Sequence, residues 1–145
     1  MYPNGANAYR KAQVTTSNPV QLVVQLYQGA ATFLERAIQA MERNDVEQAH
    51  VALIRTQDII TQLRATLNHD AGPLAQNLES LYDYFWRQLI LANVKKDPTI
   101  AREVLGHLRK LQEAWSTIAG PGWAEVSSSS TTTGFAQRAA GGTFG

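Results

Sequence analysis

Apolar residues recur every three or four positions along most of this chain, in four successive stretches. The stretches cover residues 19–43, 46–67, 73–92 and 98–118. This spacing puts the apolar side chains on one face of an α-helix, so the pattern predicts four amphipathic helices of similar length. Because the connections between them are short, we predict an all-α fold, an antiparallel up-down-up-down four-helix bundle.

Residues that begin and end helices stand between these stretches. Ser17-Asn18-Pro19 and Asp97-Pro98 each combine a capping side chain with proline at the first helical position. Asn44-Asp45 ends one helix and caps the next. Residues 68–73 (NHDAGP) form a turn before another proline, and Gly120-Pro121-Gly122 ends the fourth helix.

The remaining segments divide the chain into three parts. Residues 1–18 are a leader without helical periodicity, and residues 19–120 form the bundle domain. Residues 121–145 are rich in Ser, Thr and Gly. A segment of this composition buries too little apolar surface to offset the conformational entropy that it would lose on folding. We therefore expect a flexible tail.

Composition excludes several classes of protein. The 145 residues carry a formal net charge of +1 with scattered basic residues, which argues against a nucleic-acid partner. The chain has no cysteine, and no apolar run approaches the roughly 18 residues of a membrane span. The first residues lack the apolar segment of a signal peptide. We therefore expect a cytoplasmic protein without membrane insertion.

The third helical stretch carries more apolar surface than one core requires. Tyr82, Tyr84, Phe85 and Trp86 lie within five positions. Phe85 belongs to the core stripe, whereas Trp86, Ile90 and Val94 form a second stripe on the roughly opposite side of the helix. Three neighbouring helices cannot surround this helix, so the second stripe is exposed, covered by the leader or used by a partner.

No catalytic or metal-binding constellation is evident. Glu47 and His50 match the Glu-x-x-His pattern of di-metal bundles, but those sites need two copies and two further inward carboxylates. Glu47 also projects about 160° away from the apolar seam of its helix. The sequence contains neither a phosphate-binding glycine loop nor a nucleophile motif. We predict no metal, no cofactor and no enzymatic activity.

The order of several short motifs resembles the FliS family of flagellin export chaperones. The resemblance rests on Met1-Tyr2, Ala8-Tyr9, Val14, Thr16, residues 19–30 (PVQLVVQLYQGA), residues 57–60 (QDII), Leu63, Asn77-Leu78, residues 81–84 (LYDY), Leu89-Ile90, Ala92-Asn93 and Trp115. It covers about residues 1–119. Val23 and Gln28 depart from the residues common in the family, and the tail matches no family motif.

The resemblance implies a helical bundle that binds the disordered C-terminal segment of newly made flagellin in the cytoplasm. It further implies protection against premature polymerisation and delivery to the type III export gate of the flagellum. Whether a flagellar co-chaperone or regulator also docks stays open. So does the alternative that the surplus apolar surface forms a homodimer without a client.

Two sets of residues are the candidates for this function. We expect client binding at Val23, Leu26, Tyr27, Tyr82, Tyr84, Trp86, Ile90 and Val94. In the leader, Tyr2, Tyr9 and Val14 are candidates for a cover that lies on the spare apolar surface when no client is bound. Tyrosine suits such a cover because it combines a large contact area with a polar end that tolerates water.

Overall fold

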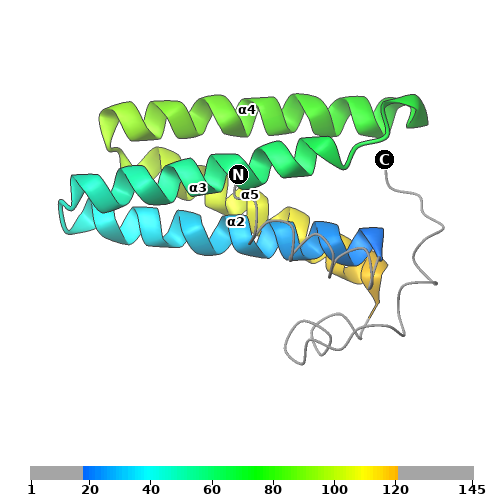
Figure 1. Ribbon diagram of the computed structural model, residues 1–145, viewed down its shortest axis with the longest axis horizontal. Coiled ribbons are helices and arrows are strands. Elements are labelled where there is room, and N and C mark those ends of the chain that lie inside the picture. The colour runs from blue at the N-terminus through cyan, green and yellow to red at the C-terminus, as the bar shows by residue number, and fades with distance from the viewer. Residues whose placement is uncertain (1–17, 121–145) are drawn as a thin grey trace, which may run out of the picture.

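A computed structural model describes residues 18–120 as four long helices and one short 3-10 turn. The elements are α2 (Pro19–Glu42), α3 (Val46–Ala65), η1 (His69–Ala71), α4 (Pro73–Lys95) and α5 (Pro98–Ala119). Successive helices run in opposite directions (Figure 1), with α5 passing obliquely behind α2 and α3. The predicted antiparallel up-down-up-down bundle is therefore confirmed.

Each predicted cap is made by a side chain or a turn that the structure shows. Asn18 Oδ1 accepts hydrogen bonds from the backbone amides of Val20 and Gln21, both at 3.1 Å. Asp45 and Asp97 cap α3 and α5 in the same way. These bonds satisfy amides that have no partner within their own helix, which fixes where each helix starts.

The helices pack in a ring, in which each contacts its neighbours in sequence and α5 closes back on α2. The most extensive packing joins α2 to α3 and α5, whereas α4 packs less extensively against α3 and α5. The core contains large fully buried side chains from every helix, among them Leu34, Leu53, Leu63, Phe85, Leu89 and Leu108. Burial of one such side chain stabilises the fold by about 1.5–3 kcal/mol.

Three residues that the periodicity assigned to the core stripes are exposed instead. They are Val46, Leu74 and Ile118. Each lies in the first or last turn of its helix, at an end of the bundle. A helical pattern predicts the direction of a side chain but not whether a neighbouring helix reaches that level, so this part of the core prediction was wrong.

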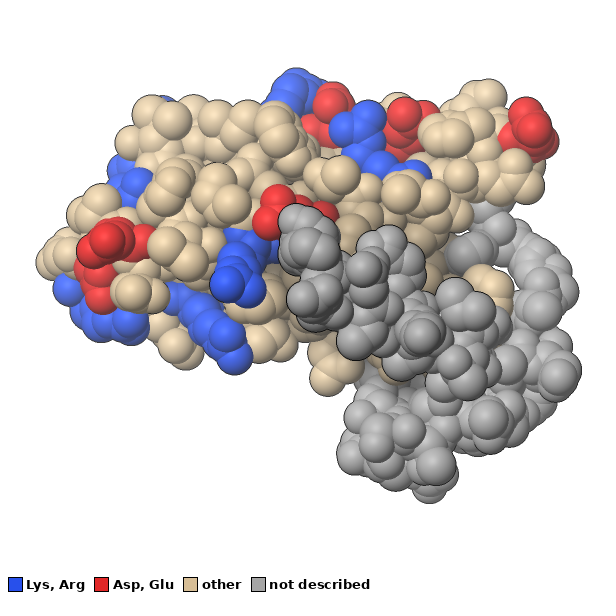
Figure 2. Space-filling model, viewed as in Figure 1, with Lys and Arg blue, Asp and Glu red and all other residues tan. Residues whose placement is uncertain are grey.

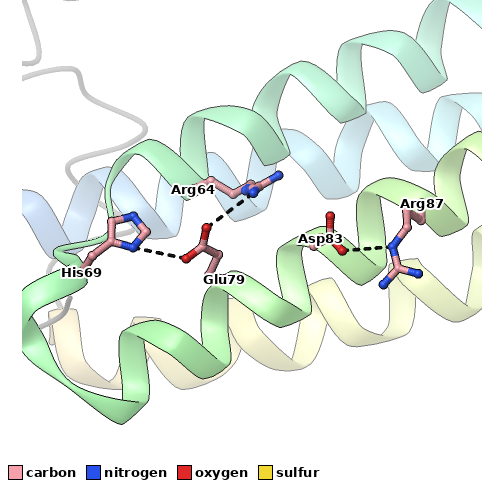
Figure 3. A network of polar contacts seen from close by, with 5 residues as sticks. All are labelled: Arg64, His69, Glu79, Asp83 and Arg87. Atoms are coloured by element: carbon pink, nitrogen blue, oxygen red, sulfur yellow. Dashed lines mark hydrogen bonds and ion pairs between the residues drawn. The ribbon is translucent and has the colours of Figure 1, made fainter.

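Polar contacts hold α4 against the end of α3 (Figure 3). Glu79 on α4 lies 3.5 Å from Arg64 of α3 and 3.2 Å from His69 of η1. One turn further along α4, Asp83 pairs with Arg87 at 3.0 Å. The side chains of the first group are 39–57% exposed, so solvent weakens their attraction. The contacts set the position of α4 rather than supplying much stability.

The predicted leader and tail lie outside residues 18–120, except for Asn18, which caps α2. Within the described part of the chain, no helix is long and apolar enough to cross a membrane.

Candidate docking surface

Four of the expected client-binding residues are buried in the bundle. They are Val23, Leu26, Tyr27 and Tyr82. The hydroxyl groups of Tyr27 on α2 and Tyr82 on α4 are 2.5 Å apart, and the ring centroids are 6.3 Å apart. In the ring of four helices, α2 and α4 lie on opposite sides. The hydrogen bond between the two tyrosines therefore crosses the centre of the bundle.

Burial changes the acidity of both tyrosines. It raises the pKa of Tyr82 to about 12, although the hydrogen bond between Tyr82 and Tyr27 offsets part of the rise. Burial, and then the neighbouring Tyr82, raise the pKa of Tyr27 even more strongly. Both hydroxyls are therefore neutral at physiological pH, where a buried neutral pair needs no counter-charge.

In this conformation neighbouring helices cover these four side chains, and their direct contact with a client stays a prediction. The apolar face of α2 is wide because α3 and α5 flank this helix on both sides and cover it. The width of the apolar face of α2 therefore reflects packing on two sides. Tyr82 lies fully within the core.

The second stripe of α4 is exposed, which is one of the three arrangements that the sequence left open. Trp86, Ile90 and Val94 are 36%, 40% and 77% exposed. Tyr84 differs from them, because it is half-buried and packs against the core with its ring centroid 6.1 Å from that of Phe85. The exposed apolar candidates thus lie along the C-terminal half of α4.

Two hydrogen bonds set the register between α3 and this part of α4. One joins Asn93 Nδ2 to His50 Nδ1 at 2.9 Å. In the other, the Gln57 side-chain amide donates to the carbonyl oxygen of Trp86 at 3.3 Å. Since the helices are antiparallel, the position between His50 and Gln57 on α3 lies level with the position between Asn93 and Trp86 on α4.

This register adds Ile54, which sequence reasoning missed. Ile54 is on the same helical face as His50 and Gln57, is 40% exposed, and lies level with Ile90. We call Ile54, Trp86, Ile90 and Val94 the α3–α4 surface. Ile54 lies outside the apolar face of α3 that packs into the core. An isoleucine on the otherwise polar side of this helix was the one sign in the sequence that Ile54 belongs to an exposed apolar surface.

The three histidines of the bundle make structural contacts. His50 bonds to Asn93, His69 pairs with Glu79, and the His107 ring stacks on Phe85 with centroids 5.8 Å apart. Among residues 18–120, no three His, Cys, Asp or Glu side chains cluster as metal ligands would. What the described helices expose instead is apolar side-chain surface. The proposed cover residues Tyr2, Tyr9 and Val14 lie outside the described residues.

Comparison with known proteins gives a consistent result. The family model described as "Flagellar protein FliS" matches residues 2–121. The flagellar secretion chaperone FliS of Bacillus subtilis is 37% identical over 112 residues, which cover 77% of this chain and 84% of that protein. Its namesake in Salmonella typhimurium is 36% identical, over 79% of this chain and 90% of its own length. The FliS chaperone of Escherichia coli is 32% identical, with 77% and 86% covered. The chain therefore belongs to the FliS family of flagellar secretion chaperones.

Proposed function

We propose that this protein is a cytoplasmic export chaperone for flagellin. In this proposal it binds the disordered C-terminal segment of flagellin, prevents premature polymerisation, and supports delivery to the flagellar type III export apparatus. The observation that supports the proposal best is the exposed α3–α4 surface on a bundle whose core is already filled.

The geometry of this surface suits an amphipathic client segment. Trp86, Ile90 and Val94 are spaced by four residues, so they follow one side of α4, and Ile54 widens the strip across to α3. A helix that lies along such a strip inserts its own apolar side chains at i, i+3 or i+4. Exposed tryptophan is a frequent anchor in protein interfaces.

The buried tyrosine pair supports the surface indirectly. Tyr82 precedes Trp86 by one turn on α4, and its bond to Tyr27 ties α4 to α2 across the core. Because α4 packs less extensively than the other helices, this tie and the contacts of Glu79 hold its position. We assign Val23, Leu26, Tyr27 and Tyr82 to this supporting role and assign direct contact to the α3–α4 surface, with Tyr84 at its flank.

A flagellin peptide tests the proposal. Titration of the full chain with a peptide from the flagellin C-terminus is followed by calorimetry, and the mass of the mixture by light scattering. A monomeric bundle that takes up one peptide supports the chaperone. If the free chain is a dimer and takes up no peptide, the exposed surface is a homodimer interface instead.

Docking at the export gate and at a flagellar co-chaperone or regulator belongs to the same proposal. These partners are expected to recognise the loaded chaperone, since delivery requires the client to be present. Pull-down of export-gate protein by the chain with and without bound peptide tests this step. Equal capture in both states would contradict it.

A further inference from the structure

A groove lies between α2 and α3, on a different side of α3 from the α3–α4 surface. Here the two helices form a shallow groove of about 400 Å³. Three arginines line it: Arg36 from α2, Arg43 directly after α2, and Arg55 from α3. Its apolar lining includes Phe33 and Val51, which is 44% exposed. The groove thus combines positive charge with an accessible apolar patch.

Two of these arginines make cation–π contacts with the Phe33 ring. The Cζ atom of Arg36 lies 5.1 Å from the ring centroid, and that of Arg55 lies 5.7 Å from it. Both distances are within the range in which a guanidinium is attracted to the face of an aromatic ring. A stacked guanidinium keeps its N–H groups available for a carboxylate and has lost part of its rotamer freedom in advance. One aromatic side chain therefore orders two anion-binding groups from different helices.

The positive charge of the groove is only partly compensated by residues 18–120. Arg43 approaches Asp45 at 3.8 Å, whereas no described carboxylate pairs with Arg36 or Arg55. The glutamates of α2 are turned toward α5 and are neutralised there, as Glu35 pairs with Arg109 and Glu42 with Arg102. In Figure 2, basic side chains face the viewer over the region where Figure 1 shows α2. The charges of α2 are therefore segregated, and its α3 side is the basic one.

We propose that this α2–α3 groove is a docking site for an acidic segment of a protein partner, one with an apolar side chain flanked by carboxylates. The carboxylates pair with Arg36 and Arg55, and the apolar side chain packs on Val51 and the exposed part of Phe33. The groove faces α2 and the α3–α4 surface faces α4, so the proposed partner is distinct from the proposed client.

The ends of the chain itself do not have the required chemistry. Residues 1–17 contain Arg10 and Lys11 and no acidic residue. Residues 121–145 contain a single acidic side chain, Glu125, together with Arg138. A nucleic acid would need a longer basic surface than three arginines in one groove. The apolar lining also favours a peptide, since a phosphate chain gains nothing from Val51.

A designed peptide tests the groove directly. The probe is a short fluorescent peptide in which Asp and Glu flank one central Leu, and binding to the full chain is measured by fluorescence anisotropy. We expect binding that weakens as the salt concentration rises. R36Q/R55Q should lower the affinity about tenfold or more, because the variant lacks the two guanidinium groups that pair with the carboxylates of the peptide. F33L should lower it by about two- to fivefold through loss of the ring face that orients the guanidinium groups.

Matched controls separate the groove from net charge. R87Q/K110Q removes the same number of positive charges from exposed positions on α4 and α5, and it should leave the affinity within about twofold of the parent. A peptide with Asn and Gln in place of the acids should not bind measurably. Melting temperatures are compared for all variants; Arg36 and Arg55 are exposed, so R36Q/R55Q should fold normally.

Several outcomes would overturn the assignment. If R87Q/K110Q weakened peptide binding as much as R36Q/R55Q does, the attraction would come from the net charge of the protein alone. If the uncharged peptide bound as tightly as the acidic one, the arginines would have no part in recognising the peptide. Inorganic polyphosphate that binds as tightly as the peptide, with no effect of F33L, would make the groove a general anion site. Absence of peptide binding would also reject the proposal, and none of these results depends on whether flagellin is the client.

Discussion

The hydroxyl groups of Tyr27 and Tyr82 meet at 2.5 Å in the middle of the bundle, where both residues are buried. A double-mutant cycle measures their coupling. Y27F should cost about 1–3 kcal/mol, because it leaves the buried Tyr82 hydroxyl without its partner. Y27F/Y82F should cost clearly less than the sum of the single variants, since no orphaned hydroxyl of the pair remains. Chemical denaturation gives the four unfolding free energies, and strict additivity would contradict the coupling.

The same pair predicts sensitivity to alkaline pH. The pKa of Tyr82 is about 12 in the folded chain, against an ordinary value of 10.0, and that of Tyr27 is also raised. A raised pKa means that the folded state holds the proton more tightly, so this stabilisation is complete below pH 10 and is lost between pH 10 and 12. The loss approaches about 1.4 kcal/mol per pH unit for each tyrosine.

The Y27F/Y82F variant is the control for this effect. It lacks both hydroxyls, so its unfolding free energy should fall less steeply than that of the parent over the same alkaline range. The rest of the sequence is identical in the two proteins, so its contribution cancels in the comparison. Parallel stability curves for the two proteins would show that the pair is not the source of the alkaline loss.

The fold was largely predictable from sequence, because helix ends and apolar faces are local properties. Asn18 and Asp97 cap the predicted helices, and a step of about 100° per residue correctly put Phe85 inside and Trp86 outside. The docking surface was only partly predictable. The burial of Tyr27 depends on two helices that flank α2, and the position of Ile54 depends on the register of α3 against α4. Neither is encoded in the periodicity of one helix.

The leader is the next element to test, because the sequence suggests that it covers spare apolar surface. Deletion of residues 2–12 removes Tyr2 and Tyr9. If the leader competes with the client, the deletion should leave peptide affinity unchanged or raise it. The free protein should bind more of a hydrophobic dye, since more apolar surface is exposed. A loss of peptide affinity would instead mean that the leader contacts the client.

Ile54 tests whether the proposed client surface extends across both helices. Ile54→Lys places a charge at a 40% exposed position, where the lysine side chain reaches solvent. We expect a loss of flagellin-peptide binding of about 1–2 kcal/mol, because a charge replaces an apolar contact. Thermal stability should change little. Ile118→Lys is the matched control on α5, at an exposed position outside the α3–α4 surface, and should leave binding intact. Equal effects of both changes would reject a localised surface.

Ile90 is the most direct test of the client surface, because Phe85 on the same helix provides an opposite control. Ile90 is 40% exposed, so Ile90→Lys should fold normally and lose about 2 kcal/mol or more of binding energy for the flagellin peptide. Phe85→Ala leaves a cavity in the core and should lower the unfolding free energy by about 3–5 kcal/mol. Calorimetry and thermal melts measure both quantities for each variant.

The two variants distinguish four possible roles of Ile90. If Ile90 belonged to a permanently covered core, Ile90→Lys would bury an unpaired charge and destabilise the fold as Phe85→Ala does. If the exposed strip served only to join two copies of the chain, Ile90→Lys would change the mass seen by light scattering and leave no peptide binding to lose. A normally folded Ile90→Lys that binds the flagellin peptide as tightly as the parent would place the client elsewhere. Loss of binding with unchanged stability is the result that fits an outward anchor on a filled bundle.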